Sequence, residues 1–454
     1  KLTPVSEGHY TSQPIDPDDY PWPGHPFKGQ MTWDLLKEES TNILSRYRRT
    51  NFTQEEVHWH PAGAKQWYTT DEELAAADRV KIRFTLQPKY HSHFLPGFAP
   101  PGEVITIEIP DPLVNNLKMV FNLQTREFNG KTNCNTRLDS VILRDLPLDR
   151  KVNKVALPYG GTISFYYSGE DPVEINVSGV IPQPYFYYGM TSDEEWENDL
   201  SKRPGPYAFF DTGNLVHMVP SKFIRGTTRL NDCMKYWRSA VQISHTTARD
   251  VSYYNNERYG RILNPCVLKY DTFVPAGAAV AFVGGNFCHF PCDWISNTVV
   301  YDNAVDNPWG TIHEINHHHQ ENWGKTQESG EMSNNAVSLV VYAKTNICSS
   351  KRSNTGWPRY TYASYELNDE DTYGLQRYST ILHFFGTETF KEFVKADQAK
   401  SWYSQDAYGI PGGEMLRASR VTNRNMRYHW NFHGTSDETL GQNALAELER
   451  LNLK

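Results

Sequence analysis

One five-residue segment, His313-Glu314-Ile315-Asn316-His317, constrains this chain more than any other part of its sequence. On a helix, two histidines four positions apart lie on one face, one turn from each other. Their imidazoles can then take two corners of a tetrahedral zinc site, while the adjacent Glu314 reaches a metal-bound water instead of the metal. The motif therefore predicts a helix that carries a catalytic zinc.

The residues around the motif suit the ends of such a helix. Asn307 fits the N-cap, Pro308 fits the first helical position, and Gly324 can end the helix. Two further histidines, His318 and His319, fall off the shared face because each residue turns the helix by about 100°. We expect these two to be solvated or to contact the ligands rather than the metal.

A catalytic zinc takes three protein ligands, so the motif needs one more. Glu321 is too far, because a rise of about 1.5 Å per residue puts it about 12 Å along the axis from His313. Glu328 and Glu331 lie beyond Gly324 and can return on a second helix. The periodicity that follows favours Glu331 and leaves Glu328 as the alternative.

The second helix is indicated by two stripes at helical spacing. The apolar stripe consists of Met332, Ala336, Leu339, Val340 and Ala343. The polar stripe consists of Glu331, Asn335, Ser338 and Tyr342. Side by side, the stripes predict a helix packed under the zinc site that presents Glu331 to the metal. Without the motif upstream, an ordinary solvated helix face would be the better interpretation.

The chemistry of such a site is hydrolysis of a peptide bond. Zinc lowers the pKa of bound water toward about 7 and polarises the scissile carbonyl, while Glu314 accepts the water proton and passes it to the leaving amine. Tyr342 is a candidate for stabilising the oxyanion because of its helix face. In a chain with 27 tyrosines, a structural role for Tyr342 is the favoured interpretation.

The segment 309–320 (WGTIHEINHHHQ), followed by Trp323, resembles the zinc motif of the enhancin-like (family M-sixty) metallopeptidases, which include enzymes that cleave mucin-type glycoproteins. Segment 331–335 (EMSNN) is similar to the family's downstream Glu and paired Asn, so the resemblance also selects Glu331. It spans about residues 80 to 445. Two departures, Asn316 in place of a usual Gly and the segment 288–292 (CHFPC), remove neither a ligand nor the base.

The resemblance implies a zinc endopeptidase, secreted or at the cell surface, that acts on mucin-type O-glycosylated proteins. Trp357, Arg359, Tyr360 and Tyr362 can supply a sugar-binding wall, although an ordinary surface loop is the favoured interpretation. Two alternatives stay open. One is a glycan-binding or adhesion module on a zincin scaffold without turnover, against which the retained ligands and base argue. The other is a peptidase indifferent to sugars.

Composition narrows the partners. The net charge is −8 and the sequence has no long basic run, which argues against a nucleic-acid partner. The sequence also has no run of about 20 apolar residues, so it predicts no transmembrane segment. The start at Lys1, without a hydrophobic leader, suggests an excised portion of a longer protein. Six cysteines allow disulfides or buried thiols, and a second zinc site at Cys288 and Cys292 lacks convincing partners.

The order of elements predicts an α+β protein in three parts. Residues 1–79 form an arm or linker with a short helical segment near 32–47. Residues 80–190 form an antiparallel β-sandwich-like domain, with strands expected at 80–86, 104–109, 118–123, 162–167 and 173–181. Residues 191–454 form a zincin-like (gluzincin) catalytic domain with a mixed sheet and mainly helices. Its expected elements are a helix at 191–202 capped by Ser192 and Glu195, a helix at 227–248, and strands at 261–273 and 278–287.

Overall fold

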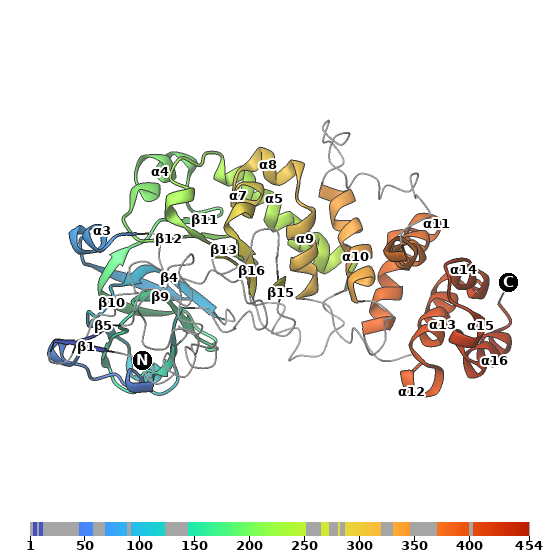
Figure 1. Cartoon of the computed structure of the whole chain (residues 1–454), viewed down its shortest axis with the longest axis horizontal. Coiled ribbons are helices and arrows are strands. Elements are labelled where there is room, and N and C mark those ends of the chain that lie inside the picture. The colour runs from blue at the N-terminus through green and yellow to red at the C-terminus, as the bar shows by residue number, and fades with distance from the viewer. Residues whose placement is uncertain are drawn as a thin grey trace. The chain divides into compact units, whose positions relative to one another are not determined.

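Figure 1 shows the computed structural model of the chain. It describes residues 3–6, 9–11, 45–57, 69–88, 92–122, 144–250, 265–271, 280–281, 287–318, 330–345, 370–398 and 403–453. The chain divides into two units. Unit 1 comprises Lys1–Asn231, Leu263–Ala279 and His289–Ile295, and unit 2 comprises Asp232–Ile262, Val280–Cys288 and Ser296–Lys454.

The first sheet of unit 1 is antiparallel throughout its described pairings. Its strands are β3 (Val80–Leu86), β4 (Ser92–Ala99), β5 (Ile105–Glu108), β6 (Lys118–Phe121), β7 (Arg144–Pro147), β8 (Val152–Val155), β9 (Gly161–Tyr166) and β10 (Val173–Pro182). They run in the order β7-β6-β9-β4-β10-β5-β8, and β3 also pairs with β10. The five strands expected from the sequence are confirmed. The two-layer sandwich stays a prediction.

Strand β4 was not among the expected strands, because Pro96 and Gly97 interrupt its sequence. Its pairing with β9 shifts register between Phe94 and Phe98, so the proline sits in a bulge rather than in a regular ladder. A Cβ atom at Gly97 would lie 2.9 Å from side-chain atoms of both Ile82 and Val180. The missing side chain therefore lets β4 pass close to its neighbours.

The second sheet is mixed. Its strands are β11 (Tyr185–Tyr187), β12 (Tyr207–Asp211), β13 (Leu215–Pro220), β14 (Cys266–Asp271), β15 (Val280–Ala281) and β16 (Phe287–Pro291), in the order β11-β12-β13-β14-β16-β15. β12 pairs with β13 antiparallel, whereas β11 with β12 and β13 with β14 are parallel. The mixed sheet expected for the catalytic part is thus present.

Two short strands and two short helices also belong to unit 1, whereas β15 and the first two residues of β16 belong to unit 2. The short elements of unit 1 are β1 (Thr3–Ser6), β2 (His9–Thr11), α3 (Asp71–Ala76) and α4 (Asp193–Asn198). The Oγ oxygen of Ser192 accepts a hydrogen bond from the Glu195 N–H at 3.0 Å, which confirms the predicted N-cap of α4. The buried Trp196 then anchors this helix by donating from Nε1 to the Thr227 carbonyl at 2.8 Å.

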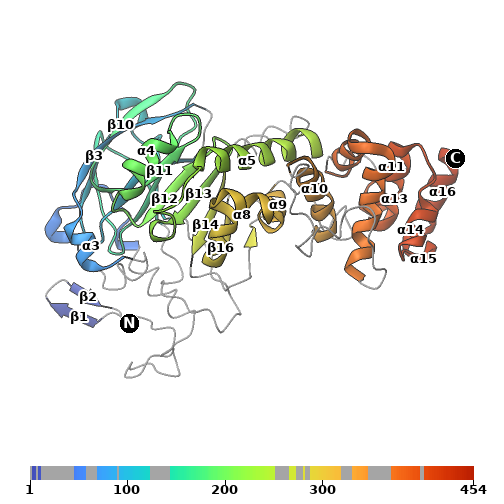
Figure 2. The same ribbon diagram turned by 90° about the horizontal axis from the view of Figure 1, so that it is seen from above.

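Unit 2 is mainly helical (Figure 2). Its helices are α5 (Leu230–Ile243), the π-helical turn η6 (Ser244–Ala248), α7 (Ile295–Val299), α8 (Tyr301–Asp306), α9 (Trp309–His317), α10 (Gly330–Thr345), α11 (Glu370–Gln398), α12 (Gln405–Tyr408), α13 (Ile410–Thr422), α14 (Arg427–Phe432), α15 (Asp437–Leu440) and α16 (Gln442–Leu451). The first residues of α5 and α7 belong to unit 1. α10 packs against α9, η6 and α11. A core of Ala336, Val340, Ile381, Phe390, Leu416 and Trp430 joins α10 to the later helices.

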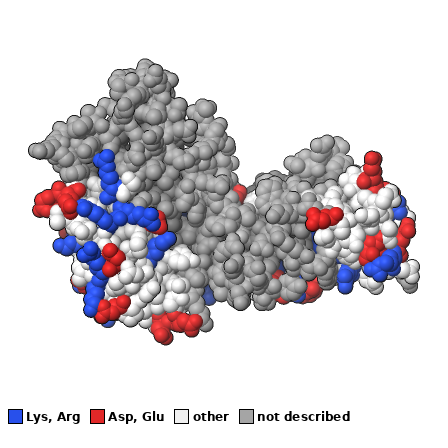
Figure 3. Space-filling view, turned by 90° about the horizontal axis from the view of Figure 1, so that it is seen from below, with Lys and Arg blue, Asp and Glu red and all other residues white. Residues whose placement is uncertain are grey.

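Charges of both signs are mixed over the described surface of Figure 3. The first sheet carries exposed ion pairs, such as Lys81 with Glu108 at 3.2 Å, and such pairs contribute little stability. The four described cysteines carry thiols rather than disulfide bonds. Across the described residues, no helix combines the length and the apolar character needed to cross a membrane.

Candidate functional site

Helix α9 carries the motif and begins at Trp309. The first helical hydrogen bond runs from the Ile312 N–H to the Pro308 carbonyl at 2.9 Å, so Pro308 is the N-cap. The expectation that Asn307 caps this helix was wrong. Its N–H donates to the Asn303 carbonyl at 2.9 Å and closes α8, so Asn307 is the C-cap of α8 and the N-cap of α9 falls one residue later. The expected stop at Gly324 lies outside the described residues.

The two motif histidines converge. Their Nε2 atoms lie 2.9 Å apart, and their rings are nearly perpendicular at 88°. Two nitrogens that each bind one tetrahedral ion at about 2.0–2.1 Å are about 3.3 Å apart, so a small rotation of either ring admits zinc. His313 and His317 are both partly exposed, which leaves the pair accessible. The geometry of the pair therefore fits a shared metal ion.

Helix α10 sets the tautomer of the first histidine. The Nδ1 atom of His313 lies 2.7 Å from the Oδ1 oxygen of Asn335. An amide oxygen can only accept, so Nδ1 carries the proton and Nε2 keeps its lone pair for a metal. The fully buried Asn334 adds a hydrogen bond from Nδ2 to the His313 carbonyl at 2.8 Å. Asn334 was outside both predicted stripes and was indicated only by the family resemblance.

The predicted third ligand lies in the first turn of α10. Glu331 stands four residues before Asn335, and positions four apart share one face of a helix. Its backbone is therefore placed one turn from the residue that contacts His313. The side chain of Glu331 lies outside the described residues, and so do Glu328, Trp357 and Arg359.

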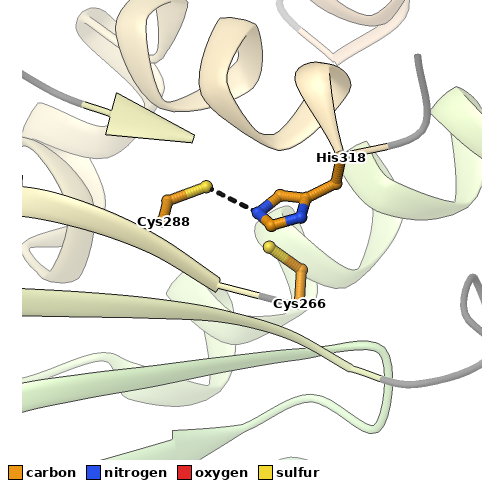
Figure 4. A group of neighbouring side chains, drawn as sticks. All are labelled: Cys266, Cys288 and His318. Carbon is orange, nitrogen blue, oxygen red and sulfur yellow. Dashed lines mark hydrogen bonds between the residues drawn. The ribbon is translucent and has the colours of Figure 1, made fainter. Parts of the chain in front are cut away.

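The histidine after the motif points elsewhere, as the helical spacing predicted. The Nε2 atom of His318 lies 2.9 Å from the Sγ atom of Cys288, and Figure 4 shows the ring directed at that sulfur. The Sγ atom of Cys288 also contacts the backbone carbonyl oxygen of Glu314 at 3.6 Å. The Glu314 side chain is partly exposed. Cys266, also labelled in Figure 4, belongs to unit 1. Sequence reasoning missed the Cys288–His318 contact because 30 positions separate the two residues.

Tyr342 packs against the start of α9. Its ring meets that of Trp309 edge to face, with centroids 6.2 Å apart and planes at 74°. Such pairs contribute about 0.5–1.5 kcal/mol beyond their buried area. The contact supports the structural interpretation of this tyrosine.

Two family models match the chain in succession. The model of the N-terminal domain of M60-like peptidases matches residues 75–178, and that of peptidase M60, enhancin and enhancin-like, matches residues 179–434. The antigenic protein P1 of Entamoeba histolytica is 29% identical over 397 residues, a match that covers 78% of this chain and 34% of P1. The chain thus spans about a third of that relative.

Solved structures share the fold at low identity. The catalytic module of the metalloprotease ZmpA from Clostridium perfringens has a TM-score of 0.57 at 16% identity, covering 81% of this chain and 78% of that one. IMPa from Pseudomonas aeruginosa, in complex with an O-glycopeptide, has a TM-score of 0.57 at 14% identity, covering 95% of this chain and 59% of that one. Because the second family model covers more than half of its residues, the chain belongs to the enhancin and enhancin-like M60 peptidases.

Proposed function

We propose that this chain is the catalytic part of a secreted zinc endopeptidase that hydrolyses peptide bonds in O-glycosylated, mucin-type proteins. The observation that carries the catalytic part of the proposal is the convergence of two Nε2 atoms at 2.9 Å, one of them held as a lone-pair donor by Asn335. Membership of the peptidase family supports the reaction.

His313, His317 and Glu331 would hold the ion, which suits zinc because two imidazoles and one carboxylate form a common catalytic ligand set. Zinc, when bound, supplies a Lewis acid for the scissile carbonyl and makes water acidic near neutral pH. Glu314 lies next to the first ligand and takes the proton from the attacking water. It then returns that proton to the leaving amine, so the peptide bond breaks without a free amide anion.

Strand β15 of unit 2 offers an edge for the substrate backbone. Strand β15 ends the strand order and contacts α9. An extended peptide can add to such an edge through main-chain hydrogen bonds and so bring its scissile bond to the motif helix. The glycosylated substrate class is supported by the O-glycopeptide bound to IMPa, which shares this fold.

Cleavage and metal content test the proposal together. The protein is incubated with a mucin and with the same mucin after deglycosylation, with and without a chelator, and its zinc is measured. We expect fragments from the glycosylated substrate alone, which disappear on chelation and in Glu314→Gln. Glu438→Gln, on the surface helix α15, serves as the matched control and keeps activity.

Each other result contradicts a named part of the proposal. Equal cleavage of both substrates would show a peptidase indifferent to sugars. Binding to mucin with zinc present and no cleavage would favour the adhesion module. If the protein takes up no zinc after reconstitution, the proposed zinc site is wrong.

A further inference from the structure

A buried arginine holds the C-terminal end of the motif helix. Arg249 directly follows η6 and is 1% exposed. Its Nη1 donates to the Oδ1 oxygen of Asn316 at 2.6 Å, and its Nη2 donates to the Asn316 carbonyl at 3.1 Å. Asn316 is itself 1% exposed and directly precedes His317. The Arg249 guanidinium therefore binds both the side chain and the backbone of Asn316, the residue next to the predicted ligand His317.

The π-helical turn contributes a second contact. The hydroxyl of Ser244 accepts from Arg249 Nη1 at 2.9 Å and donates to Asn316 Oδ1 at 2.5 Å. Burial and, to a smaller extent, the charge of Arg249 together lower the pKa of the neighbouring His245 to about 4. His245 is therefore neutral at pH 7, and it adds no second positive charge beside the guanidinium.

The same asparagine is bound to α10 on its other side. Asn316 Nδ2 donates to the Ser338 hydroxyl at 3.0 Å, and that hydroxyl donates to the Asn334 carbonyl at 2.9 Å. Asn334 Nδ2 in turn donates to the carbonyl of His313 at 2.8 Å. Each hydroxyl accepts one bond and donates one, so all the contacts can form at once. We call these five residues the Arg249–Asn316 network; they are Ser244, Arg249, Asn316, Asn334 and Ser338.

The network restricts how far α9 can slide. A shift of one residue moves a helix by about 1.5 Å, which breaks hydrogen bonds that need donor–acceptor distances of about 2.7–3.2 Å. A buried guanidinium tolerates such a loss poorly, because its desolvation costs several kcal/mol unless its donors are bound. Metal ligands must be held to within about 0.5 Å, which is finer than helix packing alone provides.

We propose that Arg249 and Asn316 are positioning residues, which fix α9 against α10 so that the two histidines of α9 and the predicted ligand Glu331 of α10 meet one ion. Neither of the two would bind the ion itself. This inference rests on the proposed zinc site. It adds that the affinity of the site for zinc depends on the Arg249–Asn316 network, whose hydrogen-bonding groups are buried beside the predicted ligands.

Zinc affinity tests the inference without a substrate. The zinc Kd of the full chain is measured by competition with a chelator, and the unfolding of the metal-free protein is measured alongside. We expect Arg249→Met and Asn316→Leu each to bind zinc about 10- to 100-fold more weakly. The double variant should lose little more than either single one, because both changes break the same contact. Arg238→Met removes an exposed arginine from α5 and leaves the Kd unchanged.

Two milder variants keep the test decisive if the first ones fold poorly. Asn316→Asp keeps an oxygen acceptor for Arg249 but loses the donor to Ser338, so its Kd should fall between those of the parent and Asn316→Leu. Ser338→Ala removes a single hydroxyl and should weaken zinc binding several-fold.

The failures are distinct. If the parent binds zinc and the four single variants at Arg249, Asn316 and Ser338 bind it as tightly, the positioning role is overturned and the zinc site stands. If affinity falls only as far as the metal-free protein loses stability, the residues are merely structural and the inference is again overturned. If the parent binds no zinc, the proposed function itself is wrong.

Discussion

The Nδ1 atom of His313 donates a hydrogen bond to Asn335 across the boundary between α9 and α10, at 2.7 Å. This bond ties the tautomer of a predicted ligand to the register of the neighbouring helix. Glu331 precedes Asn335 by four residues and shares its face of α10. The position of α10 along α9 therefore also determines where the backbone of the predicted third ligand lies. The predicted site therefore depends on how α9 and α10 are placed against each other.

Replacing Asn335 should weaken metal binding. Asn335→Leu leaves Nδ1 of His313 without its acceptor, so the imidazole is free to change tautomer or rotate, and we expect the zinc Kd to rise about 10- to 100-fold. Asn335→Asp keeps an acceptor and should retain affinity within a few-fold of the parent. Chelator competition measures both. Equal affinity of Asn335→Leu and the parent would show that the hydrogen bond does not control the ligand.

Local patterns predicted some of the regular elements but missed others, such as β7, β8, β11, β12 and β13. Alternating apolar residues located β3 and β10 within a residue or two, and the Ser192 cap located the start of α4. These signals depend on neighbours in sequence, so no tertiary information was needed. β4 was missed for the opposite reason, because Pro96 and Gly97 are tolerated there only by a bulge and a close approach of other strands.

Contacts between distant residues could not be predicted. Arg249 and Asn316 are 67 positions apart, and nothing in the periodicity of either segment indicates that they meet. The motif itself was readable because its chemistry is confined to one helical turn. The Asn307 cap failed because α8 ends directly before α9, so Asn307 closes α8 instead of opening α9.

Tyr342 should matter for packing and not for catalysis. Tyr342→Phe keeps the edge-to-face contact with Trp309, so we expect kcat to change less than about threefold. Tyr342→Ala loses the contact and should lower the free energy of unfolding. The loss should be smaller than the about 3–5 kcal/mol typical of a fully buried aromatic side chain, because the ring is partly exposed. Steady-state kinetics on a glycoprotein substrate separate the roles. A loss of about 10²–10³ in kcat for Tyr342→Phe would instead identify an oxyanion donor.

A buried carboxylate joins two helices of the C-terminal core. The Tyr378 hydroxyl on α11 donates to the Oε1 oxygen of Glu414 on α13 at 2.5 Å, and Glu414 is fully buried. Tyr378→Phe removes this bond, and we expect the free energy of unfolding to fall by about 1.5–3 kcal/mol. Urea denaturation measures the change. Tyr428→Phe, at a tyrosine that is 73% exposed, is the matched control and should have no effect, so an equal loss in both variants would contradict the prediction.

The buried His217 should make stability depend on pH. Burial lowers the pKa of this side chain from 6.5 to about 3, and its ring stacks on Tyr270. Between these two values the unfolded chain binds a proton that the folded one does not, so stability is fully present above pH 6.5 and is lost as the pH falls toward 3.

One such histidine contributes about 1.4 kcal/mol per pH unit, or about 2 kcal/mol between pH 6.5 and pH 5. We therefore expect urea denaturation to show a smaller loss of unfolding free energy across that range in His217→Leu than in the parent, by about this amount. His383→Leu, at an exposed position of α11, serves as the control and should keep the parent's slope. An unchanged slope in His217→Leu would mean that His217 binds a proton equally in the folded and unfolded chains, against what its burial requires.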